Sequence, residues 1–113
     1  MPVVIYHNPR CMKSRQTLAL LEKRGIKPRI VEYLKTPPSA AELKAVLAML
    51  GMTPRALLRP KEAKAAGLDK PDLSDEQLFA GMARNPAAIE RPIVINGKRA
   101  ALGRPPEAVL KIL

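Results

Sequence analysis

The single cysteine, Cys11, is the residue best suited to chemistry. It follows the polar segment Asn8-Pro9-Arg10 and lies just before a run of helix-forming residues that begins at Lys13. Backbone N–H groups and the positive end of a helix dipole stabilise a thiolate, and positive charge on Arg10, Lys13 and Arg15 acts in the same direction. A shift of about two units from the ordinary thiol pKa makes the thiolate the major form near pH 7. We therefore expect Cys11 to be a nucleophile; an inert buried thiol is the alternative.

Two further polar residues are candidates to assist the thiol. Ser14 stands where a Cys-x-x-Cys motif has its second cysteine, so the chain has no resolving thiol of its own. Its hydroxyl either bonds the thiolate or caps the first helical turn. His7, the only histidine, either supports the thiolate or is a strand-end histidine with a satisfied hydrogen bond. One His and one Cys at this spacing argue against a zinc site.

Three arginines precede prolines, in Arg59-Pro60, Arg91-Pro92 and Arg104-Pro105. A residue before proline is held extended, often at the end of an element where side chains face a cleft. The planar guanidinium group also matches a tetrahedral oxyanion. We predict that Arg59, Arg91 and Arg104 bind one oxyanion beside Cys11; solvated surface charge is the alternative.

The elements that position Cys11 form a predicted β-α-β unit. Residues 3–6 are a short apolar run typical of a buried strand. A helix is predicted over 13–24, with Gly25 as its stop, and a second strand over 29–33. The two strands should be parallel, with a right-handed connection.

The middle of the chain is predicted to be helical. Capping boxes at Ser39-Ala40-Ala41-Glu42 and Ser74-Asp75-Glu76-Gln77 each open a helix, and the second helix stops near Asn85. Thr53-Pro54 opens a short turn through Leu58, which Arg59-Pro60 closes.

A hairpin and a final helix complete the predicted fold. Ile93 to Ile95 and Arg99 to Leu102 are joined through Asn96-Gly97, which suits a type I′ turn, and the last helix ends at Leu113. The order β-α-β, helical insert, β-β-α is that of an α/β, thioredoxin-like mixed sheet, in which a proline placed like Pro92 is cis and faces the active thiol. We expect residues 1–113 to be a single domain of this fold.

Composition narrows the classes of partner. Lys and Arg outnumber Asp and Glu 20 to 10, giving a net charge of +10, which favours anionic partners. Aromatic residues make up only 3% of the chain and Trp is absent, which counts against nucleic-acid binding by base stacking. No apolar run approaches the roughly 20 residues of a membrane span, and the N-terminus lacks the features of a signal peptide. We expect a soluble, cytoplasmic protein.

The segment His7-Asn8-Pro9-Arg10-Cys11-Met12-Lys13-Ser14-Arg15 resembles the signature His-Asn-Pro-x-Cys-x-x-Ser-Arg of the ArsC family, the glutaredoxin-dependent arsenate reductases. Residues 55–59, 90–94 and 103–110 are similar to later blocks of that family, so the resemblance runs nearly end to end. Met12 stands where members often have glycine, and the length is that of a short ArsC-like branch.

The resemblance implies that Cys11 attacks arsenate or a similar oxyanion, that Arg59, Arg91 and Arg104 hold it, and that His7 helps activate the thiol. It implies no bound cofactor. Glutathione, as co-substrate, would reduce the thioarsenate, and glutaredoxin would recycle the mixed disulfide. The alternative is an Spx-like regulator, which shares the fold and binds RNA polymerase; such proteins usually carry Cys-x-x-Cys, which Ser14 removes here.

Overall fold

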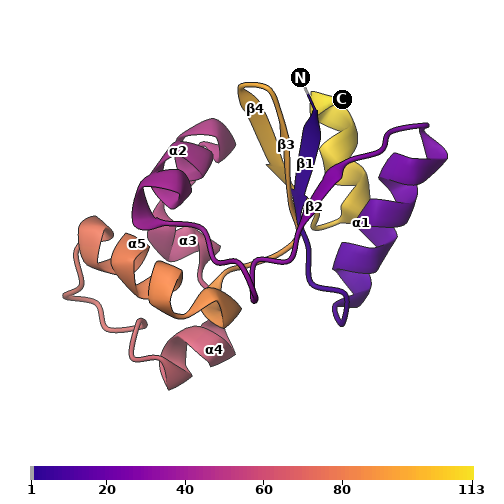
Figure 1. The fold of residues 1–113 in the computed structure, drawn as a ribbon. Helices are drawn as coiled ribbons and strands as arrows, with labels where there is room; N and C mark the ends of the chain where they lie inside the picture. Colours follow the sequence, from indigo (N-terminus) through magenta and orange to yellow (C-terminus); the bar gives the residue numbers. More distant parts are fainter. Residues whose placement is uncertain (1) are drawn as a thin grey trace. The chain divides into compact units, whose positions relative to one another are not determined.

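The structure is a computed structural model that describes residues 2–113. The chain divides into two compact units. The sheet unit contains the described residues up to Thr36 together with Arg91–Leu113, and the helical unit is Pro37–Glu90 (Figure 1). That the whole chain behaves as a single domain stays a prediction.

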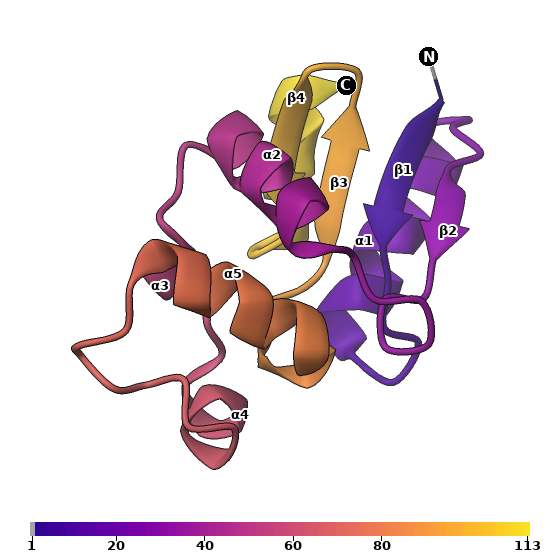
Figure 2. The same ribbon diagram turned by 60° about the vertical axis from the view of Figure 1, so that its left-hand side comes forward.

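The sheet unit holds a mixed sheet of four strands in the order β2-β1-β3-β4 (Figure 2). The strands are β1 (Val3–Tyr6), β2 (Arg29–Val31), β3 (Ile93–Asn96) and β4 (Arg99–Leu102). β1 is parallel to β2 and antiparallel to β3, and β3 is antiparallel to β4. The thioredoxin-like α/β fold predicted from the order of elements is confirmed.

Two helices, α1 (Met12–Lys23) and the 3₁₀ helix η2 (Pro106–Ile112), pack with this sheet. Buried side chains from the two helices and from the sheet form one apolar core, which consists of Ile5, Leu21, Val94, Val109 and Ile112. Removing a large aliphatic side chain from water stabilises the fold by roughly 1.5–3 kcal/mol. α1 is therefore anchored to the sheet through Leu21, in the last turn of the helix.

The strand register brings three distant chain segments to one edge of the sheet. Tyr6 at the end of β1 pairs with Ile93 at the start of β3, and Ile93 pairs with Leu102 at the end of β4. The loop after Tyr6, the residues before Ile93 and the residues after Leu102 consequently meet at this edge. Cys11, Arg91 and Arg104 belong to these three segments.

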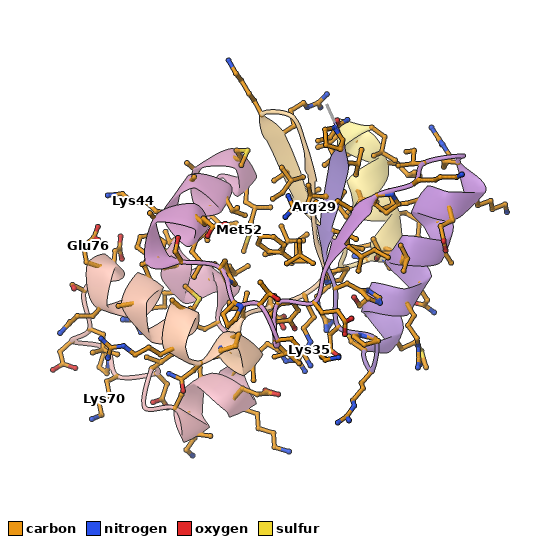
Figure 3. The ribbon with its side chains drawn as sticks, in the orientation of Figure 1. Arg29, Lys35, Lys44, Met52, Lys70 and Glu76 are labelled. Carbon is orange, nitrogen blue, oxygen red and sulfur yellow. The ribbon has the colours of Figure 1, made fainter. Side chains whose placement is uncertain are left out.

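The helical unit contains α2 (Ala40–Leu50), α3 (Pro54–Leu57), α4 (Pro60–Ala65), α5 (Asp75–Arg84) and the short 3₁₀ helix η1 (Pro86–Ala88). Both predicted capping boxes are confirmed, at Ser39 with Glu42 and at Ser74 with Gln77. An exposed ion pair joins α2 to α5, with Lys44 Nζ 3.3 Å from Glu76 Oε1 (Figure 3).

Some boundaries differ from those predicted. β2 ends at Val31 instead of residue 33, because the Glu32 carbonyl accepts hydrogen bonds from the N–H groups of Lys35 and Thr36 and the chain turns. Arg59-Pro60, predicted only as a stop, also opens α4, since proline is favoured at the first helical position.

The predicted type I′ turn is wrong. Asn96 pairs with Arg99, so the two loop residues are Gly97 and Lys98, and only Gly97 has a positive φ (64°). That pattern is typical of a type II′ turn. Asn96 stays in the strand, where its Nδ2 donates to the Ile112 carbonyl at 2.7 Å. Among residues 2–113, no helix combines the length and the apolar character needed to cross a bilayer.

Candidate active site

The loop that carries the thiol is organised by Asn8. The Asn8 carbonyl accepts from the Cys11 N–H at 3.0 Å, and its Oδ1 accepts from the Arg10 N–H at 3.0 Å. Pro9 lies between them, at the turn position that proline favours. Asn8 is buried, and the sequence analysis did not single it out as a site residue. The sequence feature that could have indicated this role is the pair Asn8-Pro9, because Asn-Pro commonly starts a turn.

This loop places Cys11 at the N-cap of α1, with extended backbone angles. Burial raises the pKa of the Cys11 thiol. The backbone N–H groups of Ser14 and Lys13 and the side chain of Arg91 hydrogen-bond the sulfur and outweigh this effect, so the pKa lies below its ordinary value. The expected position of Cys11 at the start of a helix is confirmed.

Arg91 is the cation that acts on the thiol. Besides its hydrogen bond, its positive charge lowers the pKa of Cys11. The side chains of Arg10, Lys13 and Arg15, expected to supply this charge, are exposed, and Lys13 contributes through its backbone N–H. The positive charge that stabilises the thiolate thus comes from Arg91, which is far from Cys11 in the sequence.

The side chain of Arg104 contacts the backbone of Arg91. Arg104 Nε donates to the Arg91 carbonyl at 3.0 Å, and the Gly103 N–H donates to the Pro92 carbonyl at 2.9 Å. The Arg91-Pro92 bond is cis, as predicted, and so is Arg104-Pro105. Of the three arginines predicted to bind an oxyanion, Arg91 lies at Cys11 and Arg104 contacts the backbone of Arg91.

Gly103 leaves no room for a side chain between these segments. A Cβ at this position would lie 2.6 Å from Thr17 Oγ1 on α1 and 2.7 Å from Pro92 Cγ. Glycine is thus required for the close approach of the chain after β4 to the proline before β3.

Arg59 belongs to the helical unit and has acidic partners there. Its Nη1 lies 3.0 Å from Glu90 Oε1, and its Nε lies 3.4 Å from Glu62 Oε2. A guanidinium group has five N–H donors, so these two contacts do not exhaust it. That Arg59 shares an oxyanion with Arg91 and Arg104 stays a prediction.

Ser14 and His7 form a buried pair beneath the loop. Ser14 Oγ accepts from the Asn8 N–H at 3.0 Å and lies 2.7 Å from His7 Nδ1. Burial lowers the pKa of His7, while the charge of Glu32 partly opposes this shift. The pattern fits a neutral His7 whose Nδ1 accepts a hydrogen bond from the Ser14 hydroxyl group. The Ser14 hydroxyl therefore holds the loop, and Ser14 reaches the sulfur through its backbone N–H.

The assembled groups suit nucleophilic attack on an oxyanion. A thiol with a lowered pKa stands beside a guanidinium group that can neutralise the incoming anion. No cluster of three or more His, Cys, Asp or Glu side chains within residues 2–113 could hold a metal ion.

Comparisons with known proteins identify the family of the chain. The model of the ArsC family matches residues 6–112. An arsenate reductase of Haemophilus influenzae is 51% identical over the full length of both chains. An arsenate reductase of Rhizobium meliloti is 49% identical over all of this chain and 82% of its own length. The solved structure of arsenate reductase from Vibrio cholerae is 54% identical, with a TM-score of 0.95 over 100% of this chain and 98% of the other. The chain belongs to the ArsC family.

Proposed function

We propose that the protein is an arsenate reductase, an oxidoreductase in which Cys11 is the nucleophile. The observation that carries this proposal is the hydrogen bond between Arg91 and the Cys11 thiol. It joins an oxyanion-binding side chain to a sulfur that is ionised more easily than a free thiol. The relatives that are named arsenate reductase, 51% and 49% identical, support arsenate as the substrate.

In the first step, the Cys11 thiolate attacks arsenic(V), a sulfur–arsenic bond forms, and an arsenate oxygen leaves as hydroxide and is protonated to water. Arg91 and Arg104 hold the remaining arsenate oxygens, and in our proposal Arg59 does so as well. Ser14 and His7 keep the loop in the conformation that presents the sulfur.

In the second step, the thiolate of glutathione attacks the Cys11 sulfur. A disulfide forms, and the electron pair of the sulfur–arsenic bond moves to arsenic, which is reduced to arsenic(III) and leaves as arsenite. A glutaredoxin thiolate then attacks the glutathione sulfur of this mixed disulfide, so that glutathione becomes bound to glutaredoxin and Cys11 leaves as a free thiolate. External thiols are needed because Cys11 is the only cysteine in the chain. No bound cofactor takes part, and we place the reaction in the cytoplasm.

The test is arsenate reduction by the purified protein with different reductants. We expect multiple turnover with glutathione and glutaredoxin, and poor turnover with thioredoxin alone, because thioredoxin normally attacks a protein disulfide. Mass spectrometry should find one glutathione on Cys11 and none on the Cys11→Ser variant. Arg24→Lys, a change at an exposed arginine at the end of α1, should keep full activity.

Two outcomes would contradict the proposal. Efficient turnover with thioredoxin as the sole reductant would indicate a disulfide between two copies of Cys11. No reduction with either system, together with tight binding to RNA polymerase, would favour an Spx-like regulator.

A further inference from the structure

A pocket of about 220 Å³ lies beside the thiol loop. Its walls come from two segments of the sheet unit, His7 to Arg10 after β1 and Glu32, Leu34 and Lys35 after β2. Because β1 and β2 are parallel, both segments leave the sheet at the same edge. The pocket therefore shares a wall with the loop that presents Cys11.

The lining combines apolar surface with three charges. Pro9 and Leu34 supply the apolar part, and Leu34 is one of the large apolar side chains that remain exposed, at 42%. Arg10 and Lys35 are cations at the surface, and Glu32 is a carboxylate 3.7 Å from the Lys35 ammonium (Figure 3 labels Lys35). The Glu32–Lys35 pair is exposed, and exposed pairs of this kind are weak enough to exchange for a ligand.

We propose that this pocket binds glutathione, with Arg10 and Lys35 facing its two carboxylates and Glu32 facing its ammonium group. The inference rests on the proposed function, in which glutathione attacks the Cys11 sulfur, and it assigns the place where that co-substrate is held. A ligand with two negative charges and one positive charge is complementary to two cations and one carboxylate.

Size and reach agree with this assignment. The pocket is smaller than the roughly 300–1,000 Å³ of sites for drug-sized ligands, so a tripeptide would lie partly inside and partly at the rim. An extended tripeptide spans about 10 Å, and Arg10 in the pocket wall is the residue directly before Cys11 in the chain. The proposal requires the cysteine of the bound glutathione to reach the Cys11 sulfur from the Arg10 end of the pocket.

The test uses thiol–disulfide exchange, which requires neither arsenate nor glutaredoxin. The Cys11 thiolate attacks one sulfur of oxidised glutathione, forms the mixed disulfide and releases one glutathione thiolate. The rate is compared with that of bis(2-hydroxyethyl) disulfide, a neutral probe of thiol reactivity alone. In the double variant Arg10→Ala/Lys35→Ala we expect the rate with oxidised glutathione to fall about ten-fold and the rate with the neutral probe to stay within about two-fold.

Glu32→Gln separates a binding site from general attraction of anions. Loss of a negative charge makes the surface more positive, so general attraction predicts faster reaction with oxidised glutathione. If Glu32 instead binds the ammonium group of glutathione, its loss should make the reaction with oxidised glutathione about three-fold slower. Arg24→Ala removes a positive charge elsewhere on the sheet unit and should leave the ratio of the two rates unchanged.

An unchanged ratio in Arg10→Ala/Lys35→Ala, a faster reaction in Glu32→Gln, or no reaction of Cys11 with either disulfide would overturn the assignment. Its failure is distinguishable from failure of the proposed function. If arsenate is reduced and the double variant keeps the wild-type KM for glutathione, the pocket is wrong and the function stands. If the exchange rates change as expected without arsenate reduction, the pocket stands and the function is wrong.

Discussion

Arg104 Nε donates a hydrogen bond to the carbonyl oxygen of Arg91 at 3.0 Å, across the open end of the β3–β4 hairpin. An arginine can make this bond with Nε and direct its two terminal nitrogens elsewhere, whereas a lysine has a single nitrogen for both tasks. The pair thus links the position of one guanidinium group to the backbone of the other.

Arg104→Lys should weaken oxyanion binding although the charge is kept. We expect the Kd for phosphate, an unreactive analogue of arsenate, to rise about ten-fold, the amount expected for one lost charge-assisted hydrogen bond. Isothermal titration calorimetry measures this, with Arg24→Lys as the matched control. Equal affinity in both variants would show that Arg104 does not contact the anion.

The Cys11 thiol should titrate below about 8.5, the ordinary value for a free thiol. Arg91→Met removes both the hydrogen bond and the charge that lower the pKa of Cys11, so the pKa should rise. Arg91→Lys keeps the charge and should raise it less. The rate of alkylation by iodoacetamide against pH gives the midpoint, and a wild-type midpoint at or above the ordinary value would refute the activated thiol.

His7 should make the stability depend on pH. Burial lowers its pKa from 6.5, so below pH 6.5 the unfolded chain takes up a proton that the folded protein resists. The free energy of unfolding should level off well above pH 6.5 and should fall increasingly steeply as pH drops through and below 6.5, by at most about 1.4 kcal/mol per pH unit. Urea unfolding between pH 5.5 and 7.5 measures this slope. His7→Asn should lack it, and an equal slope in that variant would assign the effect to other groups.

Gly103→Ala should lower both stability and the reactivity of the thiol. The new Cβ would collide with Thr17 and Pro92, and overpacking of this kind costs about 1–3 kcal/mol. Movement of Pro92 would also displace Arg91, so the alkylation midpoint of Cys11 should rise. Gly97→Ala is the control, because it has open space and a positive φ. It should cost about 1–2 kcal/mol in strain and leave the midpoint unchanged. A shift of the midpoint in both variants would mean that lost stability alone explains it.

Several elements were predictable because their causes are local. The capping boxes at Ser39 and Ser74 act within one helical turn, and the strand preference of residues 3–6 depends on adjacent side chains. The helix α4 was missed because the same Arg59-Pro60 pair can end one helix and begin the next. The hairpin turn was misassigned because its type depends on the register of Asn96 with Arg99.

By itself, the sequence determined that Cys11 would begin a helix, that no second thiol could resolve it, and that the chain would resemble the ArsC family. The helix start follows from residue types and spacing around Cys11, the missing thiol from the composition of the chain, and the resemblance from motifs spread along it. Only the tertiary structure decided that Arg91 is the cation on the sulfur, that Arg104 is bonded to Arg91, and that Arg59 is paired with Glu62 and Glu90. Such contacts depend on strand register and packing between segments far apart in the chain, which local preferences do not specify.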